Sequence, residues 1–222
     1  MWELVELPEG KQKIGVKWAF KKKLNPDGSI SKHKARLVAE GFLKRQSLDF
    51  LEVYAPMAQL ETIIVVVAIA CAKKGPLFQL YVKSAFLHGH LEEDVYIQKP
   101  PGFVIEGREH QVYKLRKALY GLRQAPRAWN RKIDSVLLKM QFTKCMVEHG
   151  VYVKEDRGRD LLIICLYVDD LLVTRLNSEF EMTDLGKLSY FLGLEFAYTY
   201  VDLVMHQKKY IGEILRKFNM GS

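Results

Sequence analysis

The stretch LLIICLYVDDLLV, residues 161–173, consists of two apolar runs separated by a pair of aspartates. Leu161–Tyr167 has the composition of a buried strand, and Leu171–Val173 resumes the same pattern. We therefore expect Asp169 and Asp170 at the tip of a hairpin between two apolar strands. Carboxylates at the end of a rigid strand are typical ligands of Mg²⁺ in phosphoryl-transfer sites. An Asp-Asp pair by itself is more often an ordinary turn, because Asp favours turns.

A second hairpin, rich in basic residues, is expected near the N-terminus. Val16–Lys21 alternates apolar and basic residues, residues 25–29 form an Asn-Pro-Asp-Gly-Ser turn signal, and Ser31–Ala39 resumes an extended basic pattern. Read alone, the hairpin fits two interpretations equally well. Its lysines could bind phosphates, or they could protect a solvated edge hairpin from aggregation.

Two helices and a strand are expected in the middle of the chain. Glu61–Lys74 contains β-branched residues that favour a strand, but its fourteen residues and its alanines favour a buried helix, which we predict. Leu77–Val82 follows as a short strand. Another helix begins at Ala125–Pro126, since Pro suits a first helical turn. Its apolar face carries Trp129, Ile133, Val136, Leu137 and Met140. The basic residues on the other side of this helix are most simply interpreted as a solvent-exposed face.

The C-terminal part predicts two strands, Ser189–Ala197 and Tyr200–His206, followed by an amphipathic helix, Lys208–Asn219. The apolar face of that helix carries Ile211, Ile214, Leu215 and Phe218.

The distribution of charge points to an anionic partner. The 222 residues are 49% hydrophobic, which excludes a disordered tail, and carry a formal net charge of +8. Residues 1–50 contribute +5 and residues 108–139 contribute +7, whereas residues 51–107 and 140–222 contribute −2 each. Two basic blocks therefore flank an acidic one.

Several classes of protein are excluded or disfavoured. The longest apolar run, Ile63–Ala72, is ten residues, about half of the ~20 that a bilayer requires. The N-terminus lacks the basic and apolar regions of a secretory signal. We therefore expect an intracellular protein, cytoplasmic or nuclear, without a membrane partner.

The cysteines and histidines do not indicate a zinc site. Cys71, Cys145 and Cys165 show no Cys-x-x-Cys spacing and are expected as buried small hydrophobic residues in a reducing compartment. His88-Gly89-His90 is expected to form a polar loop rather than a pair of metal ligands.

The hairpin with the two aspartates resembles the Tyr-Val-Asp-Asp box of reverse transcriptases. Other short segments along the chain resemble the reverse transcriptases of the Ty1/copia retrotransposon class. The matching segments follow the family order across residues 2–220. They are residues 17–20, 34–42, 85–89, 98–103, 117–129, 166–172, 184–193 and 207–211.

The resemblance implies an α+β fold, the fingers and palm of a right-hand polymerase, with an antiparallel palm sheet backed by helices. It places the fingers at about residues 1–76 and 95–125, the palm at 77–94 and 126–206, and the start of the thumb or connection at 207–222. No RNase H, protease or integrase portion is expected. The implied function is RNA-directed DNA synthesis by two-metal nucleotidyl transfer, as part of a Pol polyprotein.

The resemblance also assigns site residues. Asp169 and Asp170 would be catalytic ligands of two Mg²⁺ or Mn²⁺ ions. Lys34, Arg36 and Gln124 would contact the incoming nucleotide. The nucleic-acid backbone would lie along Arg123, Arg127, Arg131 and Lys132. The partners are then an RNA or DNA primer–template and deoxynucleoside triphosphates, and the oligomeric state stays open.

This chain departs from the family pattern in two main places. Members carry an aspartate in Leu-Asp-Val-Lys-x-Ala-Phe-Leu, where residues 80–87 read LYVKSAFL, so Tyr81 replaces the third catalytic carboxylate. A palm helix of roughly twenty residues, a length typical of a packed helix, is missing after Thr174. In addition, Ile64 and His90 stand where relatives commonly carry Arg and an acid or amide. We therefore expect a degenerate, inactive polymerase with weakened metal binding, or alternatively a non-enzymatic remnant that binds nucleic acid.

Overall fold

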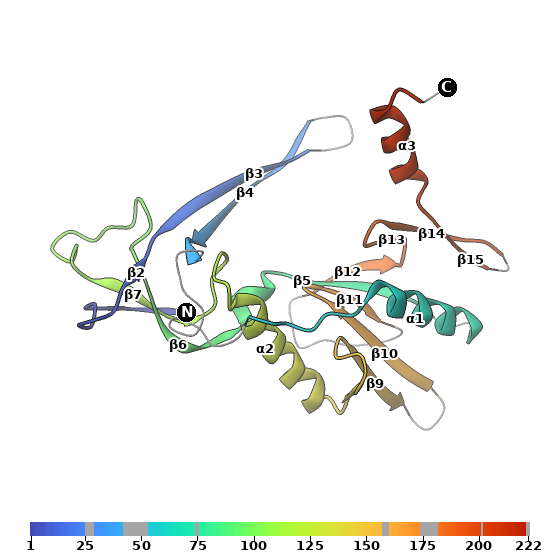
Figure 1. The fold of residues 1–222 in the computed structure, drawn as a ribbon, viewed down its shortest axis with the longest axis horizontal. Coiled ribbons are helices and arrows are strands. Elements are labelled where there is room, and N and C mark those ends of the chain that lie inside the picture. The colour runs from blue at the N-terminus through green and yellow to red at the C-terminus, as the bar shows by residue number, and fades with distance from the viewer. Residues whose placement is uncertain are drawn as a thin grey trace. The chain divides into compact units, whose positions relative to one another are not determined.

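The computed structural model has a mixed α+β fold, as expected (Figure 1). It describes residues 1–24, 29–41, 53–73, 76–156, 160–173, 182–200 and 202–220. Within these ranges it contains three α-helices and four β-sheets. The chain divides into two compact units. Unit 1 comprises Met1–Pro56 and Ser84–Val136, and unit 2 comprises Met57–Lys83 and Leu137–Ser222.

Unit 1 contains a four-stranded sheet and a long hairpin. The sheet has the order β1-β7-β6-β2. Its strands are β1 (Trp2–Val5), β7 (Val112–Lys117), β6 (His90–Ile97) and β2 (Lys13–Ile14), and only the β2–β6 pair is parallel. The expected basic hairpin is confirmed as the antiparallel strands β3 (Val16–Leu24) and β4 (Ile30–Ala39). Its predicted turn at residues 25–28 lies outside the described residues.

Helix α2 (Ala125–Lys139) confirms the helix predicted from Ala125–Pro126. Trp129, Ile133, Val136 and Leu137 on its apolar face are buried, and Met140 is half-buried. A short 3₁₀ helix, η2 (Ala85–His88), leads into β6. The expected polar loop around Gly89 is therefore wrong, because His88 ends η2 and His90 begins β6, which leaves a single residue between two regular elements.

Unit 2 contains a six-stranded antiparallel sheet with the order β12-β5-β11-β10-β9-β8. The strands are β5 (Phe78–Val82), β8 (Thr143–Lys144), β9 (Val151–Asp156), β10 (Asp160–Tyr167), β11 (Asp170–Val173) and β12 (Met182–Lys187). The strands predicted over 77–82, 161–167 and 171–173 are confirmed as β5, β10 and β11. The expected loss of a palm helix falls on residues 174–181, which lie outside the described residues.

The ambiguous segment after residue 60 is a helix, α1 (Leu60–Ala72). Its buried residues Ile63, Val66, Val67 and Ala70 belong to the same apolar cluster as Ile163, Cys165 and Leu172 of the sheet. Burial against the sheet, a tertiary contact, thus outweighs the strand preference of the β-branched residues.

The same helix corrects the expectation for one cysteine. Cys165 is buried and Cys145 half-buried, but Cys71 is exposed. Cys71 is the penultimate residue of α1, close to the end of the helix.

The C-terminal strands differ from the expectation. Instead of one strand over Ser189–Ala197, the chain forms β13 (Tyr190–Phe191) and β14 (Leu194–Tyr198), which pair with β15 (Leu203–His206) in a three-stranded sheet. The chain turns at Leu192 and Gly193, whose φ angles of 49° and 86° are incompatible with an extended strand. The final helix is confirmed as α3 (Lys208–Lys217), and Ile211, Ile214 and Phe218 on its apolar side are exposed.

Candidate active site and nucleic-acid-binding residues

The predicted hairpin tip in unit 2 is confirmed. Strands β10 and β11 pair with Tyr167 opposite Asp170, so Val168 and Asp169 form the turn and Asp170 begins the second strand. Val168 has a φ of 57°, a strained conformation for a β-branched residue that the flanking strand pair holds in place. This turn places two carboxylates next to each other at the end of a rigid strand pair.

Strand β5 lies beside this hairpin and fixes the neighbour of Asp170. Tyr81 is the register partner of Asp170 in the antiparallel β5–β11 pair. The Val82 N–H donates to the carbonyl oxygen of Asp169 over 2.9 Å, which ties the end of β5 to the turn. Directly opposed residues of an antiparallel pair place their side chains on the same face. The half-buried phenol of Tyr81 therefore shares a face with the Asp170 carboxylate.

The surroundings of Asp170 disfavour its charged form. Burial raises the pKa of its carboxyl, and the negative charge of Asp169 raises it further. The Gln79 side chain opposes both effects, since its Nε2 donates to Asp170 Oδ1 at 3.5 Å, near the limit of a hydrogen bond.

The carboxylates at this hairpin do not fit a pair of divalent ions. A two-ion site needs several anionic oxygens around the cations, and a neutral phenol with a pKa near ~10 supplies no charge at pH 7. Within the described ranges, no group of three or more His, Cys, Asp or Glu side chains is placed to hold a metal ion. Asp169 and Asp170 remain the two candidate ligands.

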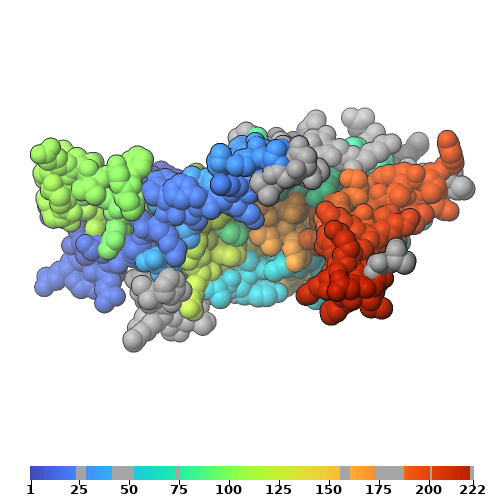
Figure 2. Space-filling view, turned by 90° about the horizontal axis from the view of Figure 1, so that it is seen from above, coloured from blue at the N-terminus to red at the C-terminus, as the bar shows by residue number. Residues whose placement is uncertain are grey.

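In unit 1, Lys34 and Arg36 belong to a larger set of cations on one face of the β3–β4 hairpin. The register pairs Lys21 with Lys34, Lys23 with Lys32 and Ala19 with Arg36. Because side chains alternate between the two faces of a strand, one face carries Lys17, Lys21, Lys23, Lys32, Lys34 and Arg36. In the space-filling view of Figure 2, the residues of these strands belong to the blue N-terminal part of the chain.

These cations repel one another. The charge of Lys23 lowers the pKa of the Lys34 ammonium most, followed by desolvation and the charge of Arg36. Neither strand contains an acidic residue. Of these six cations, the sequence predicted only Lys34 and Arg36 as site residues. The alternation of basic and apolar residues along the strands was the signal that could have identified the other four.

The base of the hairpin is anchored to the segment before α2. The Ala39 N–H donates to the carbonyl oxygen of Tyr120 over 2.7 Å, and the Arg36 guanidinium lies 5.2 Å from the centre of the Tyr120 ring. On the apolar face, Trp18 Nε1 donates to the carbonyl oxygen of Pro101 over 3.3 Å. Residues of both faces thus contact the rest of unit 1 at the base of the hairpin, Arg36 from the cation face and Trp18 from the apolar face.

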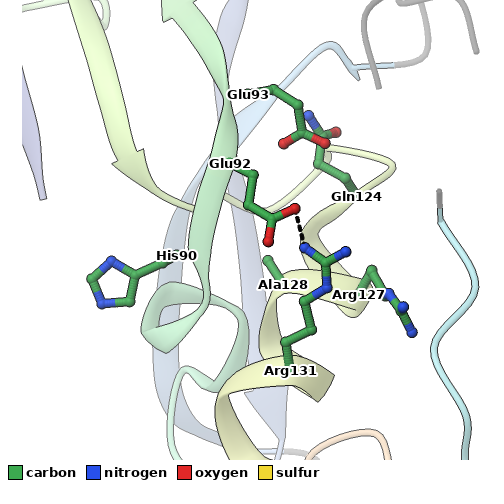
Figure 3. Close-up of a pocket in the computed structure, with 7 residues that line it drawn as sticks. All are labelled: His90, Glu92, Glu93, Gln124, Arg127, Ala128 and Arg131. Carbon is green, nitrogen blue, oxygen red and sulfur yellow. Dashed lines mark ion pairs between the residues drawn. The ribbon is translucent and has the colours of Figure 1, made fainter. Parts of the chain in front are cut away.

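The predicted residues around α2 gather partly in one pocket. Gln124, Arg127, Ala128 and Arg131 follow helical spacing and line one wall of a pocket of about 300 Å³. The remaining lining residues are His90, Glu92 and Glu93 of β6 (Figure 3). Arg123 and Lys132 do not line the pocket. The sequence interpretation missed both glutamates, because nothing local predicts that β6 packs beside α2.

The structure thus groups the predicted residues within the two units. Gln124, Arg127 and Arg131 share the pocket of unit 1, Lys34 and Arg36 share the cation face of its hairpin, and Asp169 and Asp170 lie in unit 2. Within the described residues, no helix is both long and apolar enough to cross a membrane.

Comparison with protein families matches residues 1–222 to the reverse transcriptase (RNA-dependent DNA polymerase) family. The chain therefore belongs to this family.

Relatives of the chain are polyproteins of copia-type transposons, which confirms the resemblance of the sequence motifs. The chain is 38% identical to the retrovirus-related Pol polyprotein from transposon TNT 1-94 of Nicotiana tabacum, over 99% of the chain and 18% of the relative. It is 39% identical to that from transposon RE1 of Arabidopsis thaliana, over 99% of the chain and 16% of the relative. It is 29% identical to the transposon Ty1-BL Gag-Pol polyprotein of Saccharomyces cerevisiae, over 71% of the chain and 9% of the relative. The chain thus spans less than a fifth of the length of these relatives.

Proposed function

We propose that this chain is the fingers-and-palm part of a copia-type RNA-directed DNA polymerase whose nucleotidyl transfer is lost or severely impaired. The observation that carries the proposal is the register of β5 and β11, which puts Tyr81 rather than a carboxylate beside Asp170. A phenol adds bulk and no negative charge at that point.

The proposal gives the remaining residues the roles expected from the family. Asp169 and Asp170 would bind a divalent ion weakly, since two carboxylates are fewer than a two-ion site requires. Lys34 and Arg36 would neutralise the triphosphate of a deoxynucleotide, and Gln124 would contact the nucleotide or template. The primer–template backbone would lie along the basic residues of α2 and the segment before it.

Primer extension tests this proposal. The unaltered chain, incubated with an RNA template, a DNA primer, the four deoxynucleotides and Mg²⁺ or Mn²⁺, should extend the primer little or not at all. A chain with Asp169→Asn and Asp170→Asn serves as the blank, because it lacks both candidate ligands. Robust extension by the unaltered chain relative to this blank would contradict the loss of activity.

The cation face of the β3–β4 hairpin favours a second function, nucleic-acid binding without chemistry. Six basic side chains share one face, and neither strand contains an acid, although Lys17 forms an ion pair with Glu40 directly after β4. This face would neutralise several phosphates. Each phosphate contact releases counterions, so affinity for a DNA duplex should fall steeply as the salt concentration rises.

A matched pair of variants tests this second function. Lys23→Gln removes a charge from the cation face, and Lys22→Gln removes a charge from the opposite face, where Lys22 pairs with His33. We expect Lys23→Gln to flatten the slope of log K against log salt by about 0.9, and Lys22→Gln to leave it nearly unchanged. A folded chain that does not bind a duplex at low salt would exclude this function.

A further inference from the structure

The pocket of unit 1 brings acidic and basic side chains together because β6 approaches α2 closely. The approach occurs at Gly89, where an added Cβ would lie 2.5 Å from the carbonyl carbon of Ala128. Only glycine fits this contact without moving the backbone. The start of β6 is thereby held against α2, and the acidic residues that follow Gly89 reach the basic side of the helix.

Glu92 uses this approach to pair with Arg131. Its Oε2 contacts Arg131 Nη1, and Figure 3 shows the two side chains directed at each other while Arg127 points away from the pair. Both partners are accessible, since the side chains of Arg131 and Glu92 are 43% and 68% exposed. Glu93 lines the same pocket and forms no ion pair within the described residues.

Gln124 also lines the pocket, and the residue is buried, with 6% of its surface exposed.

We propose that Glu92 occupies the place on Arg131 that a nucleic-acid phosphate takes, so that Glu92 sets how strongly this surface binds nucleic acid. The inference rests on the proposed function, in which Arg127 and Arg131 lie along the nucleic-acid backbone. In the unaltered chain Glu92 keeps a phosphate off Arg131, and its removal should leave the fold intact because so exposed an ion pair contributes little to stability. A phosphate on the freed guanidinium gains a charge-assisted contact and releases counterions from the nucleic acid.

The salt dependence of duplex binding tests the proposal. Glu92→Gln frees Arg131, so log K for a labelled DNA duplex should fall more steeply with log salt, by about 0.9 for one added phosphate contact. Glu93→Gln is the matched control, because it removes the same charge from the same pocket without breaking an ion pair. Glu93→Gln should shift log K uniformly and leave the slope as in the unaltered chain.

A second variant separates the ion pair from a general loosening of the fold. In the Glu92→Gln background, Arg131→Gln should cancel the steeper salt slope. In the chain that retains Glu92, Arg131→Gln should flatten the slope less. Equal slopes for Glu92→Gln and Glu93→Gln, or an equal effect of Arg131→Gln in both backgrounds, would overturn the role of Glu92 while leaving nucleic-acid binding intact. If neither the unaltered chain nor Glu92→Gln binds a duplex at low salt, both this inference and the proposed binding function fail.

Discussion

Tyr81 and Asp170 are directly opposed in the register of two neighbouring antiparallel strands, and the backbone next to them is joined by the hydrogen bond from Val82 to Asp169. Their side chains lie on the same face of the sheet. Any residue at position 81 is therefore an immediate neighbour of the two aspartates, and its chemistry decides how many carboxylates meet there.

Tyr81→Asp should create a site for a divalent ion. Without metal, the new carboxylate faces Asp170 and should destabilise the chain by about 0.2–1 kcal/mol through like-charge repulsion. Mn²⁺ should reverse this loss, because a bound cation neutralises the cluster. The measurement is the Tm in EDTA and in Mn²⁺.

The control for this variant is Tyr81→Asn, which has nearly the same size as aspartate but no charge. Its Tm should not respond to Mn²⁺, and that of the unaltered chain should respond weakly. A Mn²⁺ effect of equal size in all three proteins would show that the ion does not bind at position 81.

Asp170→Asn should stabilise the chain at neutral pH. Burial and the Asp169 charge raise the pKa of the Asp170 carboxyl above its unfolded value. A group of this kind favours the folded state at low pH, and this contribution is lost as the pH rises through the raised pKa. The Tm of Asp170→Asn should therefore exceed that of the unaltered chain at pH 7. The advantage should shrink as the pH falls through the raised pKa and vanish below the unfolded pKa of about 3.9. A constant difference across the pH range would refute the linkage.

Gly150→Ala should destabilise unit 2 strongly. A Cβ at this position would lie 2.1 Å from the backbone nitrogen of Ala58. The Ala58 N–H in turn donates to the carbonyl oxygen of Leu166 over 2.8 Å, so the backbone cannot move freely. We expect a loss of about 1–3 kcal/mol in the free energy of unfolding, measured by urea denaturation.

Gly212→Ala is the matched control for that substitution. Gly212 lies in α3, and no atom lies within 4 Å of an added Cβ. Alanine favours a helix over glycine, so a local gain of about 0.5–1 kcal/mol in helix stability is expected. Similar effects of the two substitutions would contradict the close approach at Gly150.

Glu148 should stabilise the start of α1 from outside the helix. Its Oε2 accepts the Gln59 N–H over 3.3 Å and the Thr62 hydroxyl over 3.2 Å, and Gln59 provides no side-chain cap itself. Glu148→Ala should lower the free energy of unfolding by about 0.5–2 kcal/mol, the usual cost of losing a cap and a charge at a helix N-terminus. Chemical denaturation measures this loss.

Thr62→Val removes only one of the two hydrogen bonds of this cap and should cost less than Glu148→Ala. In the Glu148→Ala background, Thr62→Val should cost less still, because its partner is already absent. Strict additivity of the two substitutions would argue against the cap.

Local patterns predicted much of the fold correctly. The apolar runs on either side of the two aspartates, the turn chemistry between them and the Pro at the start of α2 are local signals, and each produced the expected element. The expectation failed at Leu192, where a positive φ in a non-glycine residue divides one strand into two. It failed also at Cys71, whose exposure depends on which face of α1 meets the sheet.

The sequence by itself determined the family, because the motifs that identify it are short and contiguous and follow one order along the chain. It also determined the two basic blocks and the hairpin that carries Asp169 and Asp170. Only the tertiary structure decided that Tyr81 lies against Asp170, that six cations share one face of a hairpin and that Glu92 reaches Arg131. The physical reason is that strand register and the packing of β6 on α2 depend on contacts between segments distant in sequence. Local propensity and composition do not encode these contacts.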